Sequence, residues 1–234
     1  MTVDPVRDDA ARTRGPLSLT LLIGPGDDVR DCVLSIDEGG RKLERGFANR
    51  IDTRTGGSLV VSVRRSRAGD NEALLDEFRR NPAMLADVDV VLLSVAPEVG
   101  ADGSAIDAGH RFEVAAGEIT ALVKQHEARV IVFNASSFDP ADTTSCYAGL
   151  ADTPSLFVQH LNRSLIELSV LDGLSIVDAD RIIAEIGGAS HVEGLLSYSV
   201  HACDLLCEEL LRVLDDYGFF DDRPLLAQVG RRER

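Results

Sequence analysis

The sequence has no tryptophan, only two lysines (Lys42 and Lys124) and no long run of apolar residues. No apolar segment approaches the roughly 18–20 residues that a membrane-spanning helix needs. Basic residues are also scarce, because 24 Lys and Arg stand against 39 Asp and Glu and give a net charge of −15. A protein that binds mainly nucleic acid or an anionic membrane needs a basic surface. The composition therefore argues against both partner classes.

Cysteine is present at four positions whose spacing does not resemble a disulfide framework: Cys32, Cys146, Cys203 and Cys207. Residues 1–10 are polar and acidic and lack the apolar region of a secretory signal, so we expect a cytoplasmic bacterial protein with reduced thiols. His201 lies close to two of these cysteines, but no second Cys/His pair follows. Cysteines four residues apart on a helix are commonly core residues. The sequence therefore predicts no metal site and no cofactor.

The length of 234 residues and the hydrophobic content of 44% suit one domain with a full core. We expect a disordered N-terminal arm at residues 1–16, a single α/β domain at 17–220 and a C-terminal tail at 221–234. The tail shows no periodicity. One interpretation is that it contacts another protein, either a second copy of the chain in a homodimer or a heteromeric partner. The other expected partner is a small-molecule substrate.

Strand-like and helix-like segments alternate along the chain. The segments 89–95 and 128–133 are nearly continuous apolar runs, which are typical of parallel strands covered by helices on both faces. The other expected strands are 18–24, 29–36, 58–63 and 174–178, and the expected helices are 41–51, 71–80, 110–127, 155–171 and 196–216. This pattern predicts an αβα sandwich with a mainly parallel central sheet, flavodoxin-like winding and an extra N-terminal strand at 18–24.

Ligand sites of such sheets form at the carboxyl ends of the strands. Four polar or glycine residues follow predicted strands, and one histidine lies in the loop before the last helix. They are Ser35, Gly69, Glu98, Asn134 and His191.

This arrangement resembles the SGNH/GDSL hydrolase family over about residues 29–215. In that family the nucleophilic serine ends the first strand, usually as Gly-Asp-Ser, and Ser35 occupies the matching place within 33–39. Gly69 in Arg-Ala-Gly-Asp-Asn resembles the glycine of the second block, whose N–H joins the oxyanion hole. Glu98 falls in the third block, normally Gly-x-Asn-Asp, and His191 in the last block, normally Asp-x-x-His before an amphipathic helix.

The resemblance implies a serine hydrolase or acyltransferase acting on an ester or thioester of a small molecule. Ser35 would attack, His191 would move the proton, and the N–H groups of Ser35 and Gly69 would hold the oxyanion. Glu98 and Asn134 would bind the substrate or act as a substitute acid or base. The carboxylate that orients His191 would come from one of three residues: Asp178, Asp180 or Glu193.

The sequence also departs from the family pattern at three catalytic positions. Val33-Leu34 replaces Gly-Asp, Glu98 replaces the oxyanion-hole asparagine, and Gly188 replaces the aspartate that orients the histidine. Loss of the orienting carboxylate lowers serine-protease rates roughly 10⁴-fold, and loss of one oxyanion donor about 10²–10³-fold. The alternative interpretation is therefore a catalytically degraded SGNH-like protein: a binding or assembly subunit, or a non-hydrolytic enzyme of a biosynthetic pathway.

Overall fold

A computed structural model describes most of the chain, in seven segments. They are residues 17–34, 47, 50–51, 59–98, 104–137, 154–194 and 197–219. The predicted arm at 1–16, the predicted tail at 221–234, Ser35 and Cys146 lie outside the described residues.

A five-stranded parallel sheet with the order β2-β1-β3-β4-β5 forms the centre of the molecule. Its strands are β1 (Leu17–Ile23), β2 (Leu59–Arg65), β3 (Val90–Ser94), β4 (Arg129–Phe133) and β5 (Ser175–Val177). This confirms the predicted α/β class and the flavodoxin-like winding. The predicted N-terminal strand at 18–24 is confirmed as β1, which is the first strand of the sheet itself and pairs with β2 and β3.

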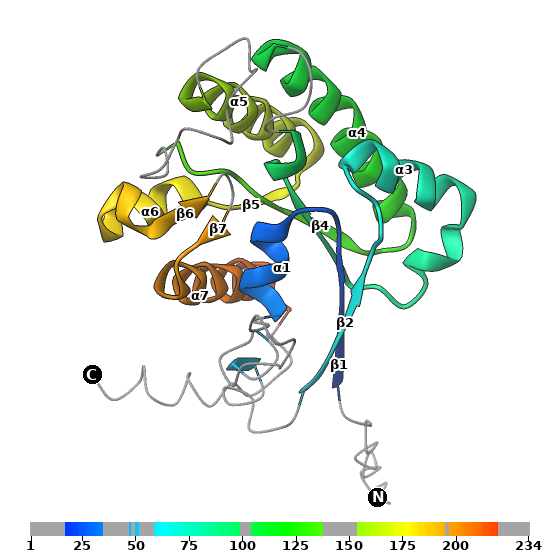
Figure 1. Cartoon of the computed structure of the whole chain (residues 1–234). Helices are drawn as coiled ribbons and strands as arrows, with labels where there is room; N and C mark the ends of the chain where they lie inside the picture. The colour runs from blue at the N-terminus through cyan, green and yellow to red at the C-terminus, as the bar shows by residue number, and fades with distance from the viewer. Residues whose placement is uncertain are drawn as a thin grey trace, which may run out of the picture.

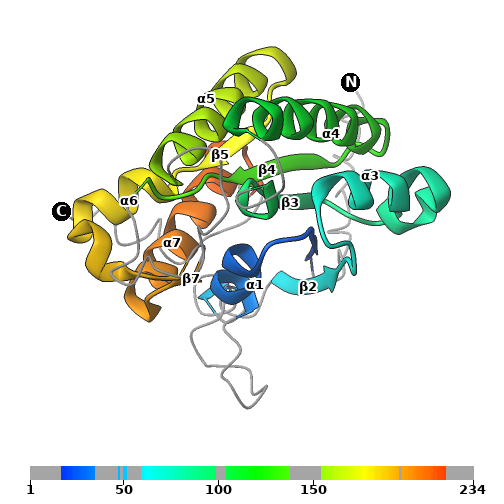
Figure 2. The same cartoon turned by 45° about the horizontal axis from the view of Figure 1, so that its top comes forward.

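Helices cover both faces of the sheet (Figures 1 and 2). One layer holds α3 (Asn71–Arg80), α4 (Ala105–Gln125) and α5 (Pro154–Asp172). The other holds α1 (Asp27–Leu34), α6 (Ala179–Ile186) and α7 (Val200–Asp216). Alternate side chains of β3 enter the two cores, Val90 and Leu92 on the α1/α7 side and Val91 and Leu93 on the α3/α4 side. The continuous apolar run at this strand is thus explained by burial on both faces.

The segment after β1 is a helix, so the predicted strand at 29–36 is wrong. The described part of this segment, α1, buries Val29, Cys32 and Val33 against the sheet and α7. These residues are spaced i, i+3, i+4, which is the helical period. The apolar content of the segment therefore belongs to one face of a short helix.

Short elements complete the described part of the chain. Three 3₁₀ helices are η1 (Pro82–Leu85), η2 (Ala96–Glu98) and η3 (Gly188–His191), and an antiparallel hairpin joins β6 (Val192–Gly194) to β7 (Ser197–Tyr198). Phe47, Leu92 and Val132 are fully buried in the core, whereas Ile176 and Leu205 are only partly buried. Within the described segments, no helix combines the length and the apolar character that crossing a membrane requires.

Candidate functional site

The loop that follows β1 leaves no room for a side chain. Gly24 donates its N–H to the Leu92 carbonyl oxygen at 2.8 Å, which holds the loop against β3. Gly26 has a φ of +126°, and an added Cβ would lie 2.6 Å from Asp28 Oδ1 and 2.8 Å from Ser94 Cβ. Both the backbone angle and the close neighbours exclude an L side chain without a shift of the loop. Glycine is therefore required at the position that immediately precedes α1.

A buried carboxylate and hydroxyl lie beneath this loop. Ser94, at the end of β3, donates its hydroxyl to Asp28 Oδ2 at 2.7 Å and accepts the Ala96 N–H at 2.8 Å. The exposed fractions of Asp28 and Ser94 are 1% and 0%. The Ser94 hydroxyl is engaged as both donor and acceptor and is shielded from solvent. We assign this pair a structural role, which is to hold α1 against the end of β3.

The loop that follows β2 is open where the β1 loop is crowded. An added Cβ at Gly69 would have no neighbour within 4 Å. The adjacent Asp70 caps α3 by accepting the Ala73 N–H at 2.7 Å, and Ser66 donates its hydroxyl to Glu77 Oε2 at 2.7 Å. The loop is thus anchored on both sides of Gly69, while the space above the glycine is free.

A buried carboxylate, Glu98, lies next to the first residue of α3. Glu98 is 6% exposed and Asn71 is fully buried. Asn71 Nδ2 donates to the Ser94 carbonyl oxygen at 2.9 Å and to Glu98 Oε1 at 3.2 Å. Burial raises the pKa of Glu98 above its usual value, and the Asn71 hydrogen bond opposes this effect. Glu98 therefore keeps its proton to a higher pH than an exposed glutamate does.

Two buried polar atoms near Glu98 have no hydrogen-bond partner: Asn71 Oδ1 and Arg111 Nη2. The Arg111 charge acts on Glu98 and lowers the pKa of that carboxyl, against the larger effect of burial. Buried polar atoms are almost always hydrogen-bonded, so unpaired ones indicate an enclosed water molecule or a ligand group. One acceptor, one donor and one carboxylate thus surround the end of β3.

The predicted nucleophile does not end the first strand, where the family pattern puts it, whereas Gly69 follows β2 and His191 precedes α7 as predicted. Because the first strand is β1, the family's first block corresponds to the loop Gly24-Pro25-Gly26-Asp27-Asp28. Gly26 and Asp27 match the glycine and aspartate of Gly-Asp-Ser, and Asp28 stands in place of the serine. The assignment of Ser35 to the end of the first strand is wrong, since this residue follows α1 in the sequence. Its approach to His191 and Gly69 stays a prediction.

His191 ends the 3₁₀ helix η3, and the β6–β7 hairpin separates it from α7. Its Nδ1 lies 2.8 Å from the hydroxyl oxygen of Ser199, the residue that caps α7, and its ring centroid lies 5.7 Å from that of His201. None of the three predicted carboxylates is a hydrogen-bond partner of this imidazole in the described part of the chain. Glu193 is exposed on β6.

Asn134 ties the carboxyl ends of β4 and β5 together. Its Nδ2 donates to Asp178 Oδ1 at 2.9 Å, and its Oδ1 accepts the Asp180 N–H at 3.2 Å. Asp178 also caps α6, while Asp180 accepts the N–H and the hydroxyl of Ser137 at 2.7 and 2.8 Å. These contacts explain the three polar residues as loop supports. The described residues contain no cluster of His, Cys, Asp and Glu side chains that could hold a metal ion.

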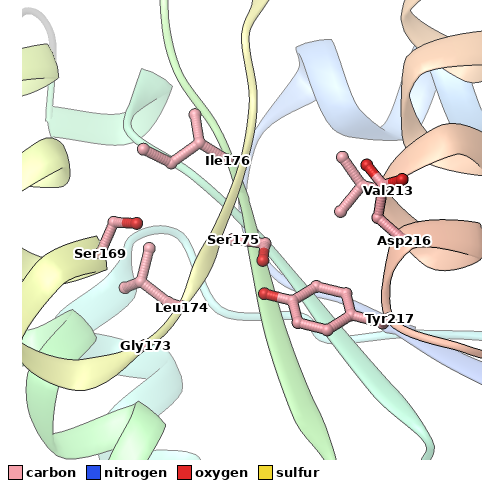
Figure 3. A pocket seen from close by; sticks show the side chains of 8 residues that line it. All are labelled: Ser169, Gly173, Leu174, Ser175, Ile176, Val213, Asp216 and Tyr217. Carbon is pink, nitrogen blue, oxygen red and sulfur yellow. The ribbon is translucent and has the colours of Figure 1, made fainter.

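Two cavities lie along β5, the end strand of the sheet. The larger has a volume of about 460 Å³ and opens between α5 and α7 at the amino end of β5 (Figure 3). It lies away from the carboxyl ends of the strands, where sites are expected. Its lining residues are Ser169, Gly173, Leu174, Ser175, Ile176, Val213, Asp216 and Tyr217.

The smaller cavity, of about 280 Å³, adjoins Asn134 and Asp178. Its charged side chains already pair with one another. Glu209 accepts from Arg181 Nη2 at 3.0 Å and from Arg212 Nη2 at 2.6 Å, and these guanidinium groups hold the pKa of Glu209 below its usual value. These charged groups satisfy one another without a ligand. The open loop at Gly69 and the polar group around Glu98 are therefore a better candidate site than this cavity.

Comparison with solved structures places the fold among the SGNH hydrolases. The chain is similar to a lipase/acylhydrolase from Enterococcus faecalis (13% identity, 85% of this chain and 96% of that one, TM-score 0.63). It is also similar to the acetyl xylan esterase AlAXEase (10%, 84% and 100%, 0.61) and to a protein predicted to be an SGNH hydrolase from Slackia heliotrinireducens (12%, 82% and 97%, 0.58).

No protein-family model matches the sequence, and no curated protein matches it either. At these low identities the solved structures establish the fold, and the chemistry has to be argued from the residues of the site.

Proposed function

We propose that this protein binds a small acylated molecule at the carboxyl edge of β2, β1 and β3 and does not cleave it by the family's serine mechanism. The observation that carries the proposal is Asp28. In the loop after the first strand, Gly26-Asp27-Asp28 follows the Gly-Asp-Ser order of the resembling family, and Asp28, which is buried and accepts the Ser94 hydroxyl, takes the place of the nucleophilic serine. Two buried hydroxyls at this edge are already engaged, Ser94 with Asp28 and the Ala96 N–H, and Ser66 with Glu77.

The binding part of the proposal is supported by the open loop at Gly69 and by the polar group beside it. A ligand carbonyl could approach the Gly69 backbone, because no atom beyond Gly69 and its two chain neighbours lies within 4 Å of the Cβ position there. Glu98 would accept a hydrogen bond from a ligand hydroxyl, amide or ammonium group. The acylated class is suggested by the names of the similar structures, which include an acylhydrolase and an esterase.

A second candidate is a hydrolase that uses Glu98 instead of a serine. Burial raises the pKa of Glu98, and a carboxylate with a raised pKa is a better general base towards water near neutral pH. This mechanism forms no acyl-enzyme. Its rate would increase as the pH rises through the Glu98 pKa, because only the ionised carboxylate accepts the proton.

Hydrolysis of para-nitrophenyl butyrate by the full chain tests both candidates. We expect no turnover above the uncatalysed rate, together with a rise in melting temperature when the non-hydrolysable amide of the same acid is added. The variants are Ser35→Ala and Glu98→Gln, with Glu193→Gln as a matched control for the loss of one negative charge at an exposed position.

The outcomes separate the mechanisms. Turnover that Ser35→Ala abolishes would overturn the proposal in favour of the serine mechanism. Turnover that survives in Ser35→Ala and in Glu193→Gln but disappears in Glu98→Gln would establish the second candidate. The absence of both turnover and thermal stabilisation would remove the acylated ligand class.

A further inference from the structure

Three thiols that are distant in the sequence meet between α1 and α7. Cys32 lies on α1, and Cys203 and Cys207 lie one turn apart on α7. The sulfur atoms of Cys32 and Cys203 are 3.0 Å apart, although 171 residues separate them. Cys207 donates its thiol to the Cys32 carbonyl oxygen at 2.7 Å. All three are free cysteines in this structure.

The first pair is close enough to be joined. A disulfide requires an S–S distance of about 2.05 Å, so the two sulfur atoms need to approach by only about 1 Å. They lie on helices that already pack against each other, with both side chains directed into the same contact. The Cys207 thiol instead donates a hydrogen bond to the backbone carbonyl oxygen of Cys32.

The three thiols differ in their access to solvent. Cys203 is partly exposed, whereas Cys32 and Cys207 are buried, at 0% and 2% exposure. The hydrogen bond with Cys203, and then burial, raise the pKa of Cys32 well above its usual range. Burial raises the pKa of Cys207 to about 12. A solute oxidant would therefore meet Cys203 first, with Cys32 as the adjacent thiol, while the Cys207 thiol is hydrogen-bonded to the Cys32 carbonyl oxygen.

We propose that Cys32 and Cys203 form a redox-active pair that closes to a disulfide when a hydroperoxide oxidises Cys203. The Cys203 sulfur attacks the peroxide, the O–O bond breaks, and the products are a sulfenic acid and one water or alcohol. The Cys32 sulfur then attacks the Cys203 sulfur, the S–O bond breaks, and the Cys32 proton leaves with the hydroxide as water. Two thiols and one peroxide thus give one disulfide.

The cross-link would fix α1 to α7 next to the crowded β1 loop. α1 also carries Asp28, which holds Ser94 below Gly26. The Cys203 sulfur lies 3.7 Å from the carbonyl oxygen of Tyr198, the last residue of β7. The disulfide would therefore join α1, which follows the first strand of the sheet, to α7, which follows the last strand. A cross-link that closes a loop of this length stabilises chiefly by restricting the unfolded chain.

Mapping of disulfides in the full chain tests the proposal. The reduced, desalted protein is treated with hydrogen peroxide, free thiols are alkylated, and peptides are identified by mass spectrometry without reduction. We expect a peptide pair joining Cys32 to Cys203, and a rise of about 5–15 °C in melting temperature that dithiothreitol reverses. The variant Cys207→Ser should keep both results, whereas Cys203→Ser should lose both.

Other outcomes would overturn the proposal. These include a cross-link of either residue to Cys146 or Cys207, irreversible sulfinic or sulfonic acid on Cys203 without a cross-link, and complete alkylation of all thiols after peroxide. If Cys32→Ser does not fold, the wild-type peptide map together with Cys203→Ser and Cys207→Ser decides the matter without it.

Discussion

The loops after β1 and β2 end neighbouring parallel strands at the same edge of the sheet, yet they are built in opposite ways. In the β1 loop, a side chain on Gly26 would be 2.6 Å from Asp28 and 2.8 Å from Ser94, and the φ of +126° excludes it independently. In the β2 loop, a side chain on Gly69 would touch nothing within 4 Å. Glycine is thus required by packing at one position, whereas at the other it leaves space open.

The proposed function rests on this difference. At the crowded β1 loop Asp28 takes the place that the Gly-Asp-Ser pattern gives to the serine, while the open β2 loop leaves neighbouring space for the proposed ligand.

The largest expected effect comes from placing a serine in the crowded loop. Gly26→Ser should destabilise the fold by about 3 kcal/mol or more, since backbone strain and overpacking add. It should not create ester hydrolysis. Urea unfolding measures the loss, with Gly26→Ala as the control that supplies Cβ alone and should show most of it. A Gly26→Ser protein as stable as the wild type would contradict the crowded geometry.

A smaller loss is expected from the pair that underlies the same loop. Ser94→Ala removes the hydroxyl that donates to the buried Asp28 carboxylate, and hydrogen bonds to charged groups contribute about 1.5–3 kcal/mol. The exposed Ser190, changed to Ala, serves as the control and should alter stability by less than about 0.5 kcal/mol. Equal unfolding midpoints for the two variants would show that the Asp28–Ser94 pair does not stabilise the loop.

Glu98, near the open β2 loop, predicts that the stability of the protein depends on pH. Because burial raises the folded-state pKa of Glu98, the folded protein binds more protons than the unfolded chain between the two pKa values. Ionisation of the buried Glu98 therefore lowers the free energy of unfolding, and this loss grows as the pH rises from the unfolded-state pKa to the folded-state pKa. The stability of Glu98→Gln relative to wild type should increase between about pH 4 and pH 7. Urea unfolding at both pH values measures it, and a difference that falls with pH would reverse the argument.

The smallest effect is expected at the open glycine. Gly69→Ala should change the free energy of unfolding by less than about 1 kcal/mol, and in the stabilising direction if the alanine restricts the unfolded chain. The measurement is the same unfolding experiment that is used for Gly26. A loss comparable to that of Gly26→Ala would remove the distinction between the two loops.

Local sequence patterns predicted much of the architecture and missed the element that decides the site. The apolar run at β3 indicated a doubly covered parallel strand, and Val90 to Leu93 are indeed buried in two cores. The segment at 29–36 was interpreted as a strand because of its apolar content, although Val29, Cys32 and Val33 carry a helical spacing. That error moved the expected first strand forward and placed the nucleophile at Ser35 rather than at the Gly26 loop.

Helix α6 was also missed in the sequence, although Asp178 caps it and Ile182 and Ile183 point into the core. Its aspartates were assigned to His191, whereas they hold Asn134 and Ser137. A sequence shows that such carboxylates lie near a strand end, but hydrogen-bond partners depend on the relative placement of several loops.

The sequence by itself determined the fold class. A parallel strand that is buried on both faces has a continuous apolar run, and such a run can be recognised from the local sequence alone. Only the tertiary structure decided that Gly26 excludes a side chain, since the atoms that crowd it include Ser94, which hydrogen-bonds Asp28 across 66 residues. The same holds for Cys32 and Cys203, which meet because strand order and helix packing bring α1 against α7. Such proximity depends on the path of the whole chain, so the periodicity of a local segment cannot predict it.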